Sequence, residues 1–183
     1  MKLGLVVHRY GADIAGGSEA HCRELASRLS AHHDVAVLTT CARDYVTWEN
    51  AYPPGTTVED GIPVTRFPVA RPRRLKVFAD LSDEVFDGDT DPQRQEEWFR
   101  ENGPESPALL DHLRAHGREY DLVLFWTFRY APSFFGMPLV EDRAVLVPTA
   151  EDDHAIHLSV LERYFQRPAG FLFLTPEEET LVS

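Results

Sequence analysis

The amino-terminal part of the chain places one amphipathic segment between two apolar runs. Residues 3–7 form a continuous apolar run, which is typical of a strand buried on both faces of a parallel sheet. The next segment has an apolar stripe at the i, i+3, i+4, i+7 spacing of an amphipathic helix, formed by Cys22, Leu25, Ala26 and Leu29. Residues 35–39 are again apolar. This order predicts two parallel strands joined by a helix in a right-handed crossover.

The same alternation of strands and helices continues to the end of the chain. Further strands are predicted at 61–68, 122–126, 144–147 and 170–174, and helices at 107–117, 131–139, 155–165 and 176–182. The strand at 61–68 is bounded by proline, so we expect it to be short and toward a sheet edge. The least regular stretch, 80–107, is interpreted as a helical or mobile insertion facing solvent. The pattern predicts a Rossmann-like, doubly wound α/β fold, with a mainly parallel sheet of about six strands and helices on both faces.

Composition indicates one ordinary domain and narrows the classes of partner. The chain has 183 residues, 43% of them hydrophobic, which is enough to enclose a core. Its 18 basic and 30 acidic residues give a formal charge of −12, a field that disfavours nucleic acid and anionic membranes as partners. Cys22 and Cys41 provide neither a disulfide framework nor a complete zinc site. The first apolar run is too short for a signal peptide or a membrane span, so we expect a cytoplasmic protein.

Three loops follow strands at the edge where open α/β sheets bind ligands: residues 8–18, 127–130 and 149–154. In the first of them, Gly16 and Gly17 precede a helix, where glycine lets a ligand approach the backbone and the free N–H groups attract an anion. Ser18 is the expected cap of this helix, and Glu19 lies in its first turn. The residues alone favour a phosphate site and a ligand-free turn about equally.

Two common phosphate-binding motifs are missing from this sequence. The glycines do not fit G-x-G-x-x-G, and the second strand ends in Thr39 and Thr40 instead of an acidic residue that would hold a ribose. No G-K-[ST] segment occurs, which excludes a P-loop. A dinucleotide-dependent Rossmann enzyme is therefore a less favoured alternative.

Several charged residues have both a functional and a structural interpretation. Arg9 is placed to reach an anion, although a purely structural role is favoured. The acidic residues 151–153 together with His154 and His157 resemble a metal cluster, but an exposed acidic helix start explains them better, so no metal site is predicted. The basic segment 71–76 is interpreted as a solvated helix start, with a site for a phosphorylated acceptor as the alternative.

Taken together, these segments resemble the amino-terminal domain of a GT-B glycosyltransferase. The first loop ends in Gly-Gly-Ser-Glu at 16–19 and is followed by Leu-Ala-Ser-Arg-Leu at 25–29. This pattern is similar to the retaining branch that includes sucrose synthases and many bacterial mannosyl- and glucosyltransferases. Weaker similarities follow in the same order: Asp-Gly-Ile-Pro-Val at 60–64, Tyr-Asp-Leu-Val at 120–123 and Thr-Pro-Glu-Glu at 175–178. The resemblance implies that residues 1–183 are the acceptor-side half of a GT-B fold.

The resemblance also implies roles for individual residues. Those expected to bind the donor diphosphate and sugar are Gly16, Gly17, Ser18 and Arg9. Those expected to face the acceptor are Thr127, Arg129 and Tyr130. Members of this branch often carry a histidine just after the fifth strand, close to the transferred sugar. Glu151 holds that position here and His154 lies three residues later, so both are candidate catalytic residues.

By the same resemblance, the protein transfers a hexosyl group from a nucleotide-diphosphate sugar to a small-molecule or glycan acceptor, with retention and without a cofactor or metal. The family binds the donor mainly on a second, carboxy-terminal domain that residues 1–183 do not include, so we expect this half alone to be inactive. A non-catalytic carbohydrate- or nucleotide-binding module is the alternative of a different class.

Overall fold

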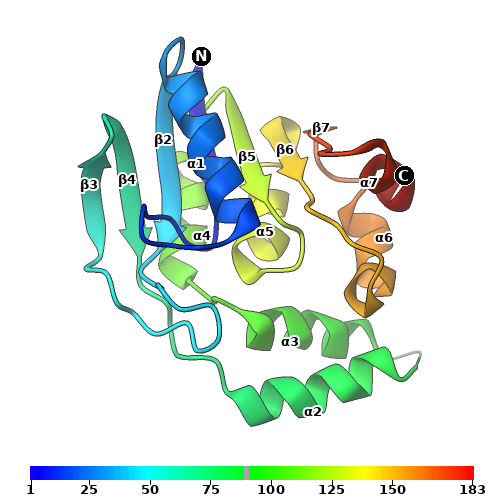
Figure 1. The fold of residues 1–183 in the computed structure, drawn as a ribbon. Helices are drawn as coiled ribbons and strands as arrows, with labels where there is room; N and C mark the ends of the chain where they lie inside the picture. Colours follow the sequence, from blue (N-terminus) through cyan, green and yellow to red (C-terminus); the bar gives the residue numbers. More distant parts are fainter. Residues whose placement is uncertain (89–90) are drawn as a thin grey trace.

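One seven-stranded sheet runs through the structure, a computed structural model that describes residues 1–88 and 91–183 (Figure 1). Its strands are β1 (Lys2–Val6), β2 (Asp34–Thr40), β3 (Gly55–Glu59), β4 (Ile62–Phe67), β5 (Leu122–Trp126), β6 (Ala144–Val147) and β7 (Gly170–Phe171). They lie in the order β3-β4-β2-β1-β5-β6-β7, and every pair is parallel except β3 with β4. The predicted Rossmann-like α/β class with a mainly parallel sheet is confirmed.

Helices cover both faces of this sheet. They are α1 (Gly17–Ser30), α2 (Leu75–Phe86), α3 (Pro92–Asn102), α4 (Pro107–His116), α5 (Ala131–Gly136), α6 (Val160–Tyr164) and α7 (Pro176–Val182). Short 3₁₀ turns are η1 (Gly117–Glu119), η2 (Met137–Leu139), η3 (Glu141–Arg143) and η4 (His154–His157). In Figure 1, α1 lies in front of the sheet, and α4 and α5 lie behind it. Within the described ranges, no helix has the length and apolar character needed to cross a membrane.

Successive side chains along a strand point to opposite faces of the sheet and so pack into two separate hydrophobic cores. In β5, Val123 and Phe125 join the larger core, to which α2–α7 contribute, whereas Leu124 and Trp126 join the core under α1. Because both faces of the strand are buried, its sequence is a continuous apolar run and not an alternating one. The same burial explains why the bounds predicted for β5 and β6 agree with the structure.

The structure contains one strand that the sequence analysis did not predict. β3 forms a hairpin with β4 through Asp60 and Gly61, whose φ angles of 51° and 81° are those of a tight turn between antiparallel strands. Residues 55–58 of β3 are exposed, so the segment has no apolar run to reveal it. β3 therefore occupies the edge, and the predicted strand β4 is the second from it.

Most of the irregular stretch 80–107 is helical: it contains the end of α2, all of α3 and the first residue of α4, and the described residues 87–88, 91 and 103–106 connect them. α2 and α3 form a hairpin across the carboxyl ends of the strands (Figure 1), and residues 89–90 lie outside the described ranges. Phe99 on α3 is fully buried, and its ring stacks on Phe134 of α5 with 3.7 Å between centroids. The hairpin is thus part of the main core as well as a surface element.

Two helix predictions need correction. The single helix predicted at 155–165 is divided into η4 and α6, because Leu158 adopts an extended backbone and the Val160 N–H donates to Gln95 Oε1 of α3 at 3.1 Å. Ser18 does not cap α1: the helix begins at Gly17, its cap position is Gly16, and no side chain caps it. Ser18 lies instead in the first turn of α1.

Candidate functional site

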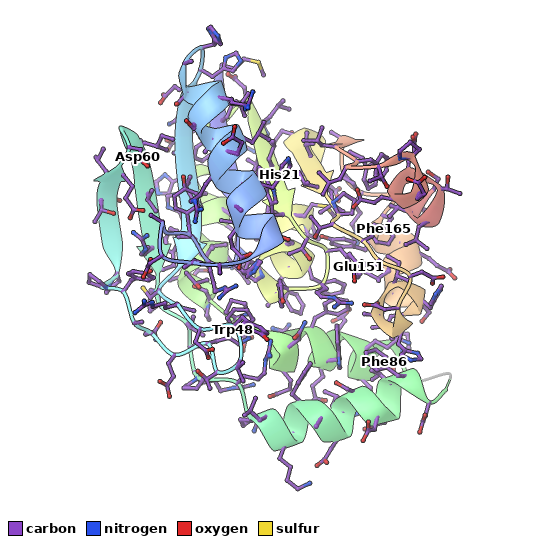
Figure 2. The ribbon with its side chains drawn as sticks, viewed as in Figure 1. His21, Trp48, Asp60, Phe86, Glu151 and Phe165 are labelled. Carbon is purple, nitrogen blue, oxygen red and sulfur yellow. The ribbon has the colours of Figure 1, made fainter. Side chains whose placement is uncertain are left out.

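The three loops selected from the sequence come together at the carboxyl edge of the sheet. The Ser18 hydroxyl at the start of α1 lies 3.4 Å from the Thr149 hydroxyl after β6. The rings of His8, after β1, and Tyr130, after β5, lie 4.2 Å apart. In the view of Figure 2, Glu151 lies on the loop leaving β6, with Phe86 of α2 below it. This edge therefore joins the start of α1, two strand-end loops and the α2–α3 hairpin.

Two threonines at this edge hold strained backbone conformations. Thr127 directly follows β5 and Thr149 lies two residues beyond β6, with φ angles of 57° and 49°. A β-branched residue rarely adopts positive φ, and such strain is concentrated at functional sites. The Thr127 N–H donates to the Val147 carbonyl at 2.8 Å, so the β5–β6 ladder holds the loop in this shape. Both strand ends are consequently fixed in position.

Gly16 and Gly17 have different surroundings, and packing explains only the first of them. A side chain at position 16 would collide with the Glu19 carboxylate, so Gly16 is explained by packing inside the loop. A Cβ at position 17 would meet nothing within 4 Å, and the φ of Gly17 is not in the positive range. Nothing in the described structure therefore requires glycine at 17. Open space over an uncapped helix start suits the close approach of an anionic ligand.

A buried charge cluster supports the loop from beneath. Glu19, at 3% exposure, accepts a hydrogen bond from His8 Nε2 at 3.0 Å and forms an ion pair with Arg9. Burial alone would raise the pKa of Glu19, but the His8 hydrogen bond and the Arg9 charge outweigh it and lower that pKa to about 2. Burial also lowers the pKa of His8 below its usual range. From the sequence, Glu19 was expected only to lie where the helix dipole favours a carboxylate, and its contacts with His8 and Arg9 were not predicted.

Arg9 is turned into the loop and away from its mouth. It is 7% exposed, and its guanidinium donates to Glu19 and, at 2.9 Å, to the Arg43 carbonyl. In this structure Arg9 therefore orders the loop 8–18. Its direct contact with a donor phosphate stays a prediction.

Arg129 and Tyr130 connect the β5 loop to its surroundings. The Arg129 guanidinium pairs with Asp153 of the β6 loop, and its backbone carbonyl accepts from Asn102 Nδ2 at 2.8 Å. Burial raises the pKa of Tyr130, whose ring packs on His8 and Trp48. Both side chains are half-buried, with part of their surface left for a ligand.

A cavity of about 350 Å³ lies between these loops and the α2–α3 hairpin. The loops contribute Tyr45, Arg73, Arg129, Tyr130, Asp153, His154 and Ala155, and the hairpin contributes Phe78, Ser82, Phe86, Trp98 and Asn102. The structure thus brings the predicted acceptor-side residues Arg129 and Tyr130 together with His154. Arg73 belongs to the basic segment 71–76, for which an acceptor site was the less favoured interpretation. The hairpin aromatics were missed because they lie outside the strand-end loops that the sequence selected.

The two candidate catalytic residues have different surroundings. His154 lines the cavity, and its ring stacks on Phe86 with 5.5 Å between centroids. Glu151 is exposed on the same loop and does not line the cavity. His157 pairs with Asp152 at 2.8 Å. Across the described ranges, no three His, Cys, Asp or Glu side chains gather in a way that would hold a metal ion.

The β6 loop is also held from the carboxy-terminal end of the chain. Glu178 on α7 is 6% exposed, and its carboxylate accepts from the Ala150 N–H at 2.8 Å and from the Leu174 N–H at 2.6 Å. Glu178 belongs to the Thr-Pro-Glu-Glu segment singled out in the sequence, where no function was attached to it alone. It fixes the loop that carries Thr149, Glu151 and His154.

Comparison with known proteins gives a likeness in fold. No family model matches the chain, and no curated protein matches it. One solved structure, "Trehalose-6-phosphate from E. coli bound with UDP-2-fluoro glucose", is similar over 100% of this chain, at 13% sequence identity and a TM-score of 0.58. This chain spans 42% of the length of that one. The likeness confirms for residues 1–183 the Rossmann-like fold expected of one half of a GT-B structure.

Proposed function

We propose that this chain is the acceptor-side domain of a glycosyltransferase that uses a nucleotide-diphosphate sugar. One observation carries the proposal. The loop that follows β6 contacts the uncapped start of α1 through Thr149, and the same loop lines the 350 Å³ cavity with Asp153 and His154. In this proposal, the start of α1 binds the anionic donor and the cavity binds a second molecule, with the β6 loop in contact with both. The solved structure of similar fold, which is bound with UDP-2-fluoro glucose, supports the same assignment.

The chemistry follows from what each part of the edge provides. Negative charge develops on the diphosphate as the sugar departs, and the N–H groups at the start of α1 are oriented to stabilise it. Gly17, Ser18 and the rest of this loop form the donor side. Thr127, Arg129 and Tyr130 orient the acceptor, which makes transfer effectively intramolecular.

Glu151 and His154 are the residues that we assign to the neighbourhood of the transferred sugar. The imidazole of His154 is exposed and lines the cavity, and the carboxylate of Glu151 is exposed on the same loop. We further assign the reaction to the retaining, hexosyl-transferring type, on the resemblance of the Gly-Gly-Ser-Glu loop. No cofactor or metal takes part in the proposed reaction.

Within this proposal, a second domain binds most of the donor nucleotide. The solved structure of similar fold is more than twice as long as the matched region, which leaves room there for such a domain. Residues 1–183 then act as the amino-terminal half of a cytoplasmic enzyme and are inactive alone. A carbohydrate- or nucleotide-binding module without catalysis is the second candidate, because the same cavity and helix start serve binding equally well.

The test is the variant Gly17→Val in the natural protein that carries this domain, assayed for nucleotide release from UDP-glucose and other nucleotide-diphosphate sugars. We expect turnover to fall by about a hundredfold or more, because the side chain covers the N–H groups that stabilise the leaving group. The fold stays intact, because a Cβ at 17 meets nothing within 4 Å.

The matched control is Gly170→Val on β7, where a Cβ also meets open space, and its turnover should equal that of the wild type. Unchanged turnover in a folded Gly17→Val variant would remove the loop from the mechanism. Tight binding of UDP-glucose without any transfer by the wild type would favour the binding module.

A further inference from the structure

The cavity beside the β5 and β6 loops has an aromatic wall built by the α2–α3 hairpin. Trp98 of α3 contacts Phe78 and Phe86 of α2, with ring centroids 5.8 and 5.4 Å apart, and its Nε1 donates to Ser82 Oγ at 2.9 Å. His154 extends this wall by stacking on Phe86. Aromatic faces held by such contacts suit a flat ring, which packs in an offset-stacked or edge-to-face arrangement.

The lining of the cavity also includes a cation without a carboxylate partner, Arg73, which lies next to this wall. Arg73 Nε donates to the Asn102 carbonyl at 2.9 Å, and another guanidinium nitrogen donates to Asn102 Oδ1 at 2.9 Å. Both acceptors are neutral, and within the described ranges Arg73 forms no ion pair. The third guanidinium nitrogen of Arg73, Nη1, forms no hydrogen bond with the residues that the structure describes. Asp44 attracts Arg73 only through its charge, and its carboxylate accepts hydrogen bonds from the Thr47 N–H and hydroxyl.

The position of Arg73 is fixed by its packing. Its guanidinium lies over the ring of Trp48 at 4.9 Å and over the ring of Phe78 at 4.7 Å. These cation–π contacts and the Asn102 hydrogen bonds hold the planar group at the cavity wall, so little side-chain freedom is lost when a ligand binds. The remaining guanidinium nitrogen, Nη1, has N–H groups left to form charge-assisted hydrogen bonds with a carboxylate or phosphate oxygen.

The charge balance of the cavity is opposite to that of the molecule. Arg73 and Arg129 line the cavity, and Asp153, which pairs with Arg129, is the one Asp or Glu among its lining residues. A local excess of positive charge thus lies in a chain of net charge −12. The volume of about 350 Å³ is near the lower end of small-molecule pockets and suits one substituted ring.

We propose that this cavity binds an acceptor in which a flat aromatic ring carries an anionic group, with Arg73 binding the anion and the hairpin rings binding the ring. The term acceptor rests on the proposed function, whereas the binding itself does not. Arg129 and His154 line the same cavity on the β5 and β6 loops, and we expect the hydroxyl that accepts the sugar to face these two residues. The substrate class is therefore a hydroxylated aromatic acid or aryl phosphate.

The test compares three probes by isothermal titration calorimetry on the 183-residue chain: 4-hydroxybenzoate, its neutral analogue 4-hydroxybenzamide, and inorganic phosphate. We expect the benzoate to bind at least about tenfold more tightly than the benzamide, because only the benzoate forms a charge-assisted pair with Arg73. Inorganic phosphate, which has no ring, should bind more weakly than the benzoate. Equal affinity for acid and amide, an affinity for phosphate that equals that of the benzoate and is lost in Arg73→Gln, or no binding of the benzoate would each overturn the proposal.

Arg73→Gln should abolish the preference for the acid over the amide, and Arg73→Lys should retain part of it. The matched control is Arg118→Gln. It removes an exposed arginine on η1, just before the amino end of β5 and outside the cavity, and should leave the preference unchanged. Melting curves identify any variant that fails to fold, and the wild-type comparison of acid with amide then decides the question. Selective binding without glycosyl transfer would refute the proposed function alone, and transfer without acid selectivity would refute this inference alone.

Discussion

At the scale of single residues, the loop after β1 depends on the buried carboxylate of Glu19. This group neutralises Arg9, which is itself 7% exposed, and accepts a hydrogen bond from His8. We expect Glu19→Gln to lower the free energy of unfolding by about 3 kcal/mol, because Arg9 is left buried without a countercharge. Urea denaturation at pH 7 measures the change. The matched control is Glu24→Gln, which breaks a solvent-exposed pair with Arg28 on the same helix and should have almost no effect.

The same carboxylate gives a pH dependence with a defined sign. The pKa of Glu19 is lowered from 4.5 to about 2 in the folded protein, so its contribution to stability is present above pH 4.5 and is lost as the pH falls toward 2. The stability difference between wild type and Glu19→Gln should therefore shrink over this range. A difference that stays constant down to pH 2 would show that the ionised form of Glu19 is not what stabilises the fold.

Residue positions at strand ends were predictable from the sequence, whereas side-chain directions were not. The rule that ligands bind at the carboxyl ends of strands selected Arg129, Tyr130 and His154, and the structure places all three on one cavity. The same rule selected Arg9, which turns inward because Glu19 offers it a buried partner. Arg73 was read as part of a solvated helix start, because its contact with Trp48 joins segments that no sequence periodicity relates.

At the scale of elements, the β3–β4 hairpin depends on a turn with positive φ at both central residues. Gly61 has a φ of 81°, and a Cβ there would meet nothing within 4 Å. Substitution by alanine thus tests backbone conformation alone. We expect Gly61→Ala to lower the free energy of unfolding by about 1 kcal/mol, and Gly170→Ala, in open space at ordinary φ, to leave it nearly unchanged. Equal effects of the two substitutions in urea denaturation would contradict the assigned turn.

The elements that sequence predicted best are those whose burial follows from their own residues. β5, β6 and α7 have the predicted bounds. The two strands show their burial on both faces as apolar runs in the sequence, and α7 begins with the recognisable segment Thr-Pro-Glu-Glu. β3 escaped prediction because its residues are mostly exposed and it exists only through pairing with β4. The break between η4 and α6 escaped because its cause, the hydrogen bond from Val160 to Gln95, comes from a helix far away in the sequence.

At the scale of the whole molecule, the α2–α3 hairpin joins stability to the candidate site. Phe99 and the preceding residue on the same helix, Trp98, both pack into the main core, and Trp98 also lines the cavity. The cavity is thus formed by an element that the core itself holds in place. Such a wall keeps its shape without a ligand, which reduces the ordering cost of binding.

The net charge of −12 gives the whole molecule a measurable response to salt. Excess like charge destabilises the compact state, and salt screens this repulsion over distances beyond about 10 Å at 0.1 M. Salt also weakens the exposed ion pairs, but each contributes only about 0–1 kcal/mol. We therefore expect the melting temperature to rise by about 2–4 °C between 20 and 500 mM NaCl, the shift that about 1 kcal/mol gives in a chain of this size.

A double variant isolates the electrostatic part of that response. Glu49 and Glu162 are exposed and have no ion pair or side-chain hydrogen bond to the residues that the structure describes. Changing both to lysine removes about a third of the excess negative charge without breaking a contact, so the rise with salt should be smaller than in the wild type. Any effect of NaCl that does not depend on charge is common to both proteins and cancels in the comparison. A melting temperature that falls with salt in the wild type would mean that the surface ion pairs, and not the net repulsion, determine how this molecule responds to its ionic surroundings.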